Sequence, residues 1–117
     1  MPTVEIELDE ARAQDVRVDD EILAIDLTDG RTIVTPLAWY PRLYYGTPDE
    51  RANFEINGDG RYLRWPDLDE DLTVAGILLG RSSGESPRSL KRWLEAREEA
   101  AKHSVLQVAE KNAKYGK

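Results

Sequence analysis

Residues that form turns crowd the middle of the chain, between Trp39 and Gly80, and this limits the length of every element there. The stretch contains seven of the nine aromatic residues and five of the eight glycines, and most of the six prolines lie in it or beside it. Glycine and proline interrupt both helices and strands. We therefore expect several short elements packed around aromatic side chains, rather than a bundle of long helices.

The size and composition of the chain fit one folded domain. A chain of 117 residues with 40% hydrophobic and 33% charged residues is able to bury a compact core. The three tryptophans and five tyrosines argue against a disordered chain, because disordered segments are poor in aromatic residues. The chain has no cysteine, which excludes disulfides, thiolate catalysis and zinc–sulfur sites.

Antiparallel strands are predicted in two places. Apolar residues in 22–27 and 32–37 flank Asp29-Gly30, a typical hairpin turn because glycine tolerates a positive φ. The alternation around Val16 adds a strand before them, so we expect a three-stranded meander. A second hairpin should turn at 57–60, Asn-Gly-Asp-Gly, and continue into a strand that ends at Trp65.

Helix boundaries are marked by prolines and capping residues. Thr47 and Glu50 form a capping box with proline between them, which predicts a short helix there. A second short helix is predicted over 72–79, with Thr73 at its start and Gly80 at its end. A long helix should begin after Ser86 and reach about residue 112.

These elements define the expected organisation. We predict an α+β fold in which an antiparallel sheet, made of the β-meander and then the hairpin, carries short helices on one face and is followed by a long C-terminal helix. The predicted parts are an N-terminal arm (1–14), an α+β core domain (15–84) and a C-terminal helix and tail (85–117). In the arm, Val4, Ile6 and Leu8 alternate with acidic residues, so it is either a short edge strand or a mobile arm.

The charge of the chain is unevenly distributed. The net charge is −7, but residues 85–117 contain eight basic and five acidic residues. An alternative function as a nucleic-acid-binding or regulatory protein would therefore use the basic residues of the C-terminal helix, while the acidic core would oppose nucleic acid. These basic residues are Arg88, Lys91, Arg92, Arg97 and Lys102. The N-terminal sequence is acidic and has no apolar run, so we expect a cytoplasmic protein with no signal peptide and no membrane segment.

Three phrases in the chain resemble a known bacterial family. They are Pro-Leu-Ala-Trp-Tyr-Pro-Arg-Leu at 36–43, Thr-Pro-Asp-Glu-Arg-Ala-Asn-Phe-Glu at 47–55 and Trp-Pro-Asp-Leu-Asp-Glu-Asp-Leu-Thr-Val at 65–74. They are similar to the domain-of-unknown-function family DUF2442, and the resemblance runs from about Val16 to Gly80 and on through 89–94. It implies a small α+β protein with no established catalytic residue. It also implies a partner, because many members are encoded beside a second small protein in pairs that look like toxin–antitoxin modules. Some members carry a helix-turn-helix, which the single long helix here does not match.

Catalytic and metal sites receive little support from the residues. The acids Asp67, Asp69, Glu70 and Asp71 would suit Mg²⁺ or Ca²⁺, but their spacing does not match a calcium loop. Carboxylates are also expected before a helix for another reason, because they interact favourably with its positive N-terminal end. The sequence leaves open whether they bind a metal. The one histidine, His103, is followed by Ser104, but the two cannot form a catalytic pair, because neighbouring residues of a helix point in different directions. We expect no cofactor and no enzymatic activity, with a metal-dependent enzyme as the least favoured function.

The aromatic and basic residues of the middle suggest an interaction surface instead. Trp39, Phe54 and Trp65 are expected in the core, whereas tyrosines and arginines, Arg51 among them, are candidates for protein contacts. The candidate interaction residues are Tyr40, Arg42, Tyr44, Tyr45, Arg61, Arg64 and Trp93. A stripe of apolar residues along the C-terminal helix, from Leu90 to Val108, is longer than a small domain covers. We therefore expect a protein-interaction module that binds the product of a neighbouring gene, as an antitoxin-like partner, or that self-associates as a homo-oligomer through this helix.

Overall fold

The computed structural model describes residues 11–115, and the side chains of residues 11–104. The expected N-terminal arm with Val4, Ile6 and Leu8 therefore lies outside the described residues for nearly all of its length, as do the side chains of Val105 and Val108. The chain forms two compact units, with the boundary between Gly84 and Glu85. Each unit is described by itself.

The first sheet confirms the predicted meander. Its antiparallel strands follow the order of the chain: β1 (Ala13–Val18), β2 (Ile22–Leu27) and β3 (Thr32–Pro36). Gly30 closes the turn between β2 and β3 with a φ of +97°, and its N–H donates to the Leu27 carbonyl at 3.1 Å. At the preceding turn, the carboxylate of Asp19 accepts hydrogen bonds from the N–H groups of Glu21 and Ile22.

The second sheet contains the predicted hairpin and one strand that was not predicted. Its antiparallel strands, again in chain order, are β4 (Glu55–Asn57), β5 (Tyr62–Trp65) and β6 (Glu70–Thr73). The turn η2 (Gly58–Gly60) has three successive residues with positive φ. The predicted helix over 72–79 was too long at its start, since residues 70–73 pair with β5 and α4 (Val74–Leu78) begins only afterwards. Thr73 does cap this helix, because its hydroxyl accepts from the Gly76 N–H at 3.0 Å.

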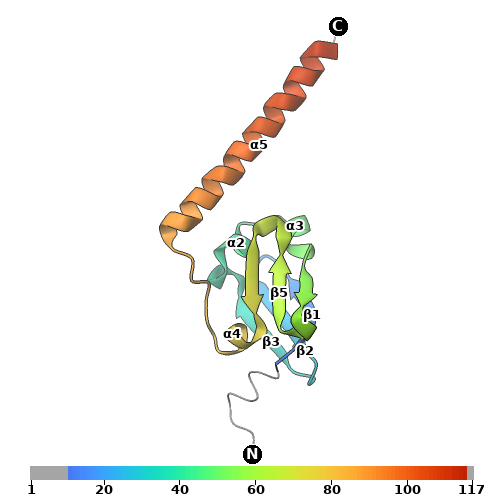
Figure 1. Cartoon of the computed structure of the whole chain (residues 1–117), viewed down its shortest axis with the longest axis vertical. Helices are drawn as coiled ribbons and strands as arrows, with labels where there is room; N and C mark the ends of the chain where they lie inside the picture. The colour runs from blue at the N-terminus through green and yellow to red at the C-terminus, as the bar shows by residue number, and fades with distance from the viewer. Residues whose placement is uncertain (1–10, 116–117) are drawn as a thin grey trace, which may run out of the picture. The chain divides into compact units, whose positions relative to one another are not determined.

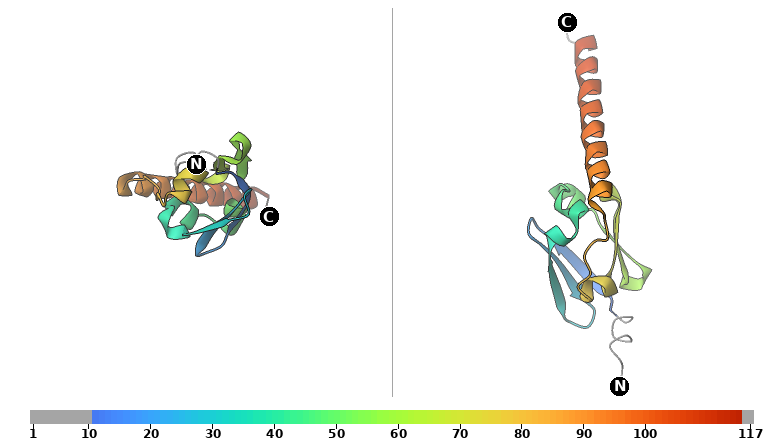
Figure 2. Two further views of the ribbon diagram at one scale, coloured as in Figure 1. Left: turned by 90° about the horizontal axis from the view of Figure 1, so that it is seen from below. Right: turned by 90° about the vertical axis from the view of Figure 1, so that its left-hand side faces the viewer.

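Short helices lie at the two ends of the sheets. They are η1 (Leu37–Trp39), α2 (Pro41–Tyr44), α3 (Pro48–Ala52) and η3 (Pro66–Leu68), in addition to α4. Figures 1 and 2 place α2 and α3 at one end and α4 at the other. The predicted capping box starts α3: the Thr47 hydroxyl accepts from the Glu50 N–H, and the Glu50 carboxylate accepts from the Thr47 N–H.

The core lies between the two sheets, which face each other (Figure 2). Leu23 and Ile25 of β2 and Leu63 and Trp65 of β5 have no accessible surface. The expectation for Trp65 is thus confirmed. Trp39, which was expected in the core, is exposed, and the residue that η1 buries is Leu37. The α+β class is confirmed, and its six strands form two sheets rather than one.

The second unit is the long helix α5 (Pro87–Tyr115). Its start is capped as predicted, because the Ser86 hydroxyl accepts from the Ser89 N–H at 3.1 Å. Among the described residues, no helix combines the length and the apolar character needed to cross a lipid bilayer.

Candidate functional site

Three aromatic side chains project into solvent from the segment that forms η1 and α2. Trp39, Tyr44 and Tyr45 have accessible fractions of 41%, 46% and 51%. The rings of Tyr44 and Tyr45 pack edge to face, with their centroids 5.2 Å apart. We call these three residues the aromatic surface. Tryptophan and tyrosine are enriched at the centres of protein interfaces, because they bury a large area with few rotatable bonds.

Tyr40 is not exposed, and the prediction that it belongs to an interaction surface is wrong. It is buried together with Leu43 on the inner side of this segment, and its hydroxyl donates a hydrogen bond of 3.0 Å to the Arg81 carbonyl. Burial raises the pKa of the Tyr40 phenol, the Thr35 hydroxyl opposes this shift and the negative charge of Glu70 adds to it. Tyr40 therefore anchors the segment instead of binding a partner.

A second anchor is Arg51, which was expected on the surface and is buried. Its Nε donates to the Leu43 carbonyl at 2.8 Å, and its Nη2 donates to the Tyr44 carbonyl at 2.7 Å. These carbonyls lie at the end of α2, and the Leu43 carbonyl also accepts a hydrogen bond of 3.1 Å from the Gly46 N–H. The remaining nitrogen, Nη1, lies 3.0 Å from the carboxylate of Asp20, and the main-chain carbonyl of Arg51 accepts from the indole of Trp65. No sequence pattern distinguishes this arginine from the exposed ones.

Two of the predicted surface arginines pair with acids of the β6 region. The guanidinium of Arg42 donates to the Asp69 carbonyl at 3.0 Å and lies 3.6 Å from its carboxylate. The guanidinium of Arg64 contacts Asp71 at 2.7 Å and Asp69 at 3.5 Å. The hydrogen bond and charge of Asp71 raise the pKa of Arg64. Arg61, the third candidate, is exposed at the start of β5.

The four acids near β6 do not converge on one point. Asp67 accepts from the Asn53 amide at 2.9 Å, while Asp69 and Asp71 pair with arginines. Glu70 points to the opposite face of the strand, because neighbouring side chains of a strand alternate. Among the described residues, no group of histidine or acidic side chains is arranged to hold a metal ion.

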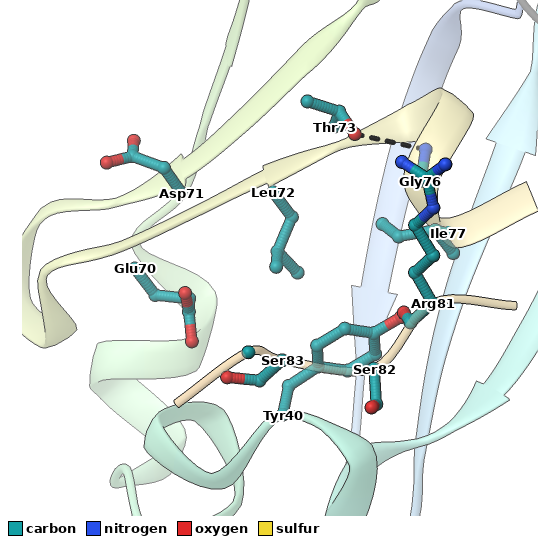
Figure 3. A pocket seen from close by; sticks show the side chains of 11 residues that line it. Tyr40, Glu70, Asp71, Leu72, Thr73, Gly76, Ile77, Arg81, Ser82 and Ser83 are labelled. Carbon is teal, nitrogen blue, oxygen red and sulfur yellow. Dashed lines mark hydrogen bonds between the residues drawn. The ribbon is translucent and has the colours of Figure 1, made fainter. Parts of the chain in front are cut away.

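A cleft of about 250 Å³ opens beside β6. One wall is formed by residues 70–73 of β6, and the other by residues 81–84. In Figure 3 the side chains of Glu70 and Leu72 point toward Tyr40 and Ser83, whereas Asp71 points away. The second wall is hydrogen-bonded to the segment that carries the aromatic surface, since the Ser83 N–H donates to the Trp39 carbonyl at 3.0 Å. The carboxylate, hydroxyl and guanidinium groups of this cleft suit recognition by hydrogen bonds and charge.

The remaining candidate residues belong to α5. Trp93 is half-buried, and the guanidinium of Arg97 lies over its ring, 4.7 Å from the centroid. Lys102 pairs with Glu98 at 3.7 Å along the helix. Two of the five basic residues considered for nucleic acid thus have contacts within α5. His103 is exposed on the same helix.

Comparison with protein families decides to which one this chain belongs. The family model described as "Protein of unknown function (DUF2442)" matches residues 13–83. The chain belongs to this family. The matched part of the DUF2442 chain includes both sheets, the aromatic surface and nearly all of the cleft, whereas α5 follows it. The expected continuation of the resemblance through 89–94 thus lies outside the match.

Two solved structures resemble the DUF2442 chain. One is a crystal structure of a protein of unknown function from Rhodospirillum rubrum, with 31% identity and a TM-score of 0.58, covering 65% of this chain and 94% of that one. The other is a solution NMR structure of an uncharacterized protein from Chromobacterium violaceum, with 20% identity and a TM-score of 0.56, covering 75% of this chain and 81% of that one. At 20% identity the second likeness concerns the fold alone. No curated protein matches the chain.

Proposed function

We propose that this protein is a cytoplasmic, non-enzymatic interaction module that binds a second protein through its aromatic surface. The observation that carries the proposal is the exposure of Trp39, Tyr44 and Tyr45 on one segment of seven residues. Large aromatic side chains dominate the affinity of many interfaces when they enter pockets of the partner.

Two buried side chains hold the segment that carries the aromatic surface in place, and this favours binding. Arg51 bonds the carbonyls that end α2, and Tyr40 bonds the chain at Arg81. A surface that is already ordered loses less conformational entropy on association, so more of the contact energy becomes affinity. An arrangement of this kind suits a stable partner contact better than a loop that orders only on binding.

The resemblance to DUF2442 gives the proposal its specific form, an antitoxin-like member of a two-gene pair. The partner is then the product of the neighbouring gene. The first unit, residues 1–84, contains eighteen acidic and eight basic residues. A partner with a basic surface would associate faster with such a unit, because opposite charges steer the encounter.

The proposal is tested by co-expressing the protein with the product of the neighbouring gene and measuring the affinity of the purified complex by calorimetry. Trp39→Ala and the double variant Tyr44→Ala/Tyr45→Ala should each weaken binding by about tenfold or more. The matched control is Tyr62→Ala, because Tyr62 is also exposed, at 53%, but belongs to β5 and not to the segment of η1 and α2.

Two results would count against the proposal. One is the absence of any complex at micromolar concentration of both proteins. The other is a complex whose affinity is unchanged by the aromatic substitutions, or is lowered equally by Tyr62→Ala. Circular dichroism of each variant shows whether the fold is retained.

A further inference from the structure

We infer that the outer edge of β6, with the cleft beside it, is a binding site for an extended basic segment of a partner protein, which adds to the second sheet as a further strand. This inference deepens the proposed function and rests on it, in that the segment belongs to a partner. The site is separate from the aromatic surface, so each is tested on its own.

The hydrogen-bond pattern of β6 leaves main-chain groups on its outer edge. The Val74 N–H donates to the Arg61 carbonyl at 2.9 Å, which sets the phase of the ladder between β5 and β6. Residues of an antiparallel strand alternate between bonding to the neighbouring strand and facing away from it. Leu72 therefore bonds to β5, while the N–H and C=O of Asp71 face away from it.

The cleft runs along this edge. It is lined by all four residues of β6, Glu70 to Thr73. The side chains of Glu70 and Leu72 point into it, whereas Asp71 lines it although its side chain points away, so that the main chain of Asp71 borders the cavity. The Asp71 main chain thus faces a hollow that is walled on its far side by residues 81–84 (Figure 3).

The other sheet edges are less suited to an added strand. On β1, the N–H of Val16 donates to the carboxylate of Asp15 at 2.8 Å, and a bulge interrupts the register after Ala13. β3 ends in Pro36, which has no N–H, and β4 has only three residues. Bulges and prolines are among the features that protect sheet edges from pairing, and β6, which is one residue longer than β4, has neither.

The chemistry of the cleft points to a basic segment. In strand addition, main-chain hydrogen bonds supply affinity and pockets for alternate side chains supply specificity. The volume of about 250 Å³ lies below that of most drug-sized ligand sites, so it suits a side chain entering from a peptide. A lysine or arginine entering it would meet the Glu70 carboxylate beside Tyr40, with Arg81 on the other wall, on a unit with eighteen acidic and eight basic residues.

The test uses a phage-displayed library of random heptapeptides, selected on the full-length protein and then measured as fluorescent peptides by anisotropy. Asp71→Pro removes the edge N–H, and proline is tolerated on an edge strand because that N–H makes no ladder bond. Asp71→Thr is the matched control, since both variants lose the carboxylate that pairs with Arg64. We expect lysine or arginine to be enriched, and binding to be tenfold or more weaker for Asp71→Pro than for Asp71→Thr.

Further variants separate this site from the aromatic surface. Glu70→Gln should weaken the selected peptides, whereas Trp39→Ala should leave their binding unchanged even if it abolishes the proposed partner complex. The inference is overturned if no peptide is enriched, if Asp71→Pro and Asp71→Thr bind equally, or if Trp39→Ala removes peptide binding. It is also overturned if the edge pairs with a second copy, seen as self-association that Asp71→Pro abolishes in sedimentation velocity. Thermal unfolding establishes that both Asp71 variants are folded.

Discussion

Arg51 should contribute about 3 kcal/mol to the free energy of unfolding, which the substitution Arg51→Met would reveal. The side chain is 9% exposed and donates to two main-chain carbonyls at 2.8 and 2.7 Å. Hydrogen bonds from charged groups contribute about 1.5–3 kcal/mol each. We expect the lower end of the sum for these two bonds. Methionine also removes the cost of burying a charge, and the Leu43 carbonyl keeps a hydrogen bond from the Gly46 N–H.

The contact between Arg51 and Asp20 adds little to this sum. The Asp20 side chain is 89% exposed, and solvent-exposed ion pairs contribute less than about 1 kcal/mol. Asp20→Asn is therefore the matched control, and it should shift the urea midpoint only slightly. Unfolding in urea, followed by tryptophan fluorescence, measures both variants. A loss below about 1 kcal/mol for Arg51→Met, or an equal loss for Asp20→Asn, would show that the carbonyl bonds do not hold α2 in place.

Three further perturbations test the fold. Gly60→Ala should lower the free energy of unfolding by about 2 kcal/mol in urea titrations, because φ is +93° and the new Cβ would lie 3.0 Å from a main-chain oxygen of β1. Gly30→Ala, at φ +97° but in open space, should lower it by about half as much. The raised pKa of Tyr40 predicts stability that is complete below pH 10.0 and falls as the pH rises above it; Tyr40→Phe should reduce this fall in urea midpoints. The pKa of Asp26 is lowered, first by its hydrogen bond from Thr32, so its stabilisation is present above pH 3.8 and lost as the pH falls below it. Acid titration of Asp26→Asn should show a weaker pH dependence.

Elements with local signals were predicted correctly. The turn at Asp29-Gly30 and the caps at Thr47 and Thr73 each depend on residues within four positions of one another. Such signals act before any tertiary contact exists, so a single sequence is enough to read them.

β6 was missed because its signal is not local. Its residues, Glu-Asp-Leu-Thr, include two acids and one strongly apolar side chain, which is a weak strand pattern. Pairing with β5 makes it a strand, with Leu72 opposite Leu63 and Asp71 opposite Arg64. Strand propensity depends on such neighbours more than on the segment itself.

Which aromatic residues are buried and which are exposed could not be predicted from the sequence either. Between Trp39 and Tyr45 nearly every position is large and partly apolar, so no periodicity shows which side faces the core. The chain direction set by Pro41, together with the bonds of Tyr40 and Arg51, decides it. The sequence therefore assigned two residues of this segment to the wrong side: Tyr40, expected on the surface, is buried, and Trp39, expected in the core, is exposed.

The strand order has a consequence for how the chain folds. Both sheets join only strands that follow one another in the sequence, so each can grow by successive closures of short loops, which are fast. The slow step should be the meeting of the two halves, where Arg12 bonds to Asp59, 47 residues away, and Gly60 seats against Ala13. Folding of this protein is then the docking of two locally formed meanders, and the positive-φ turn of η2 lies at the point where they join.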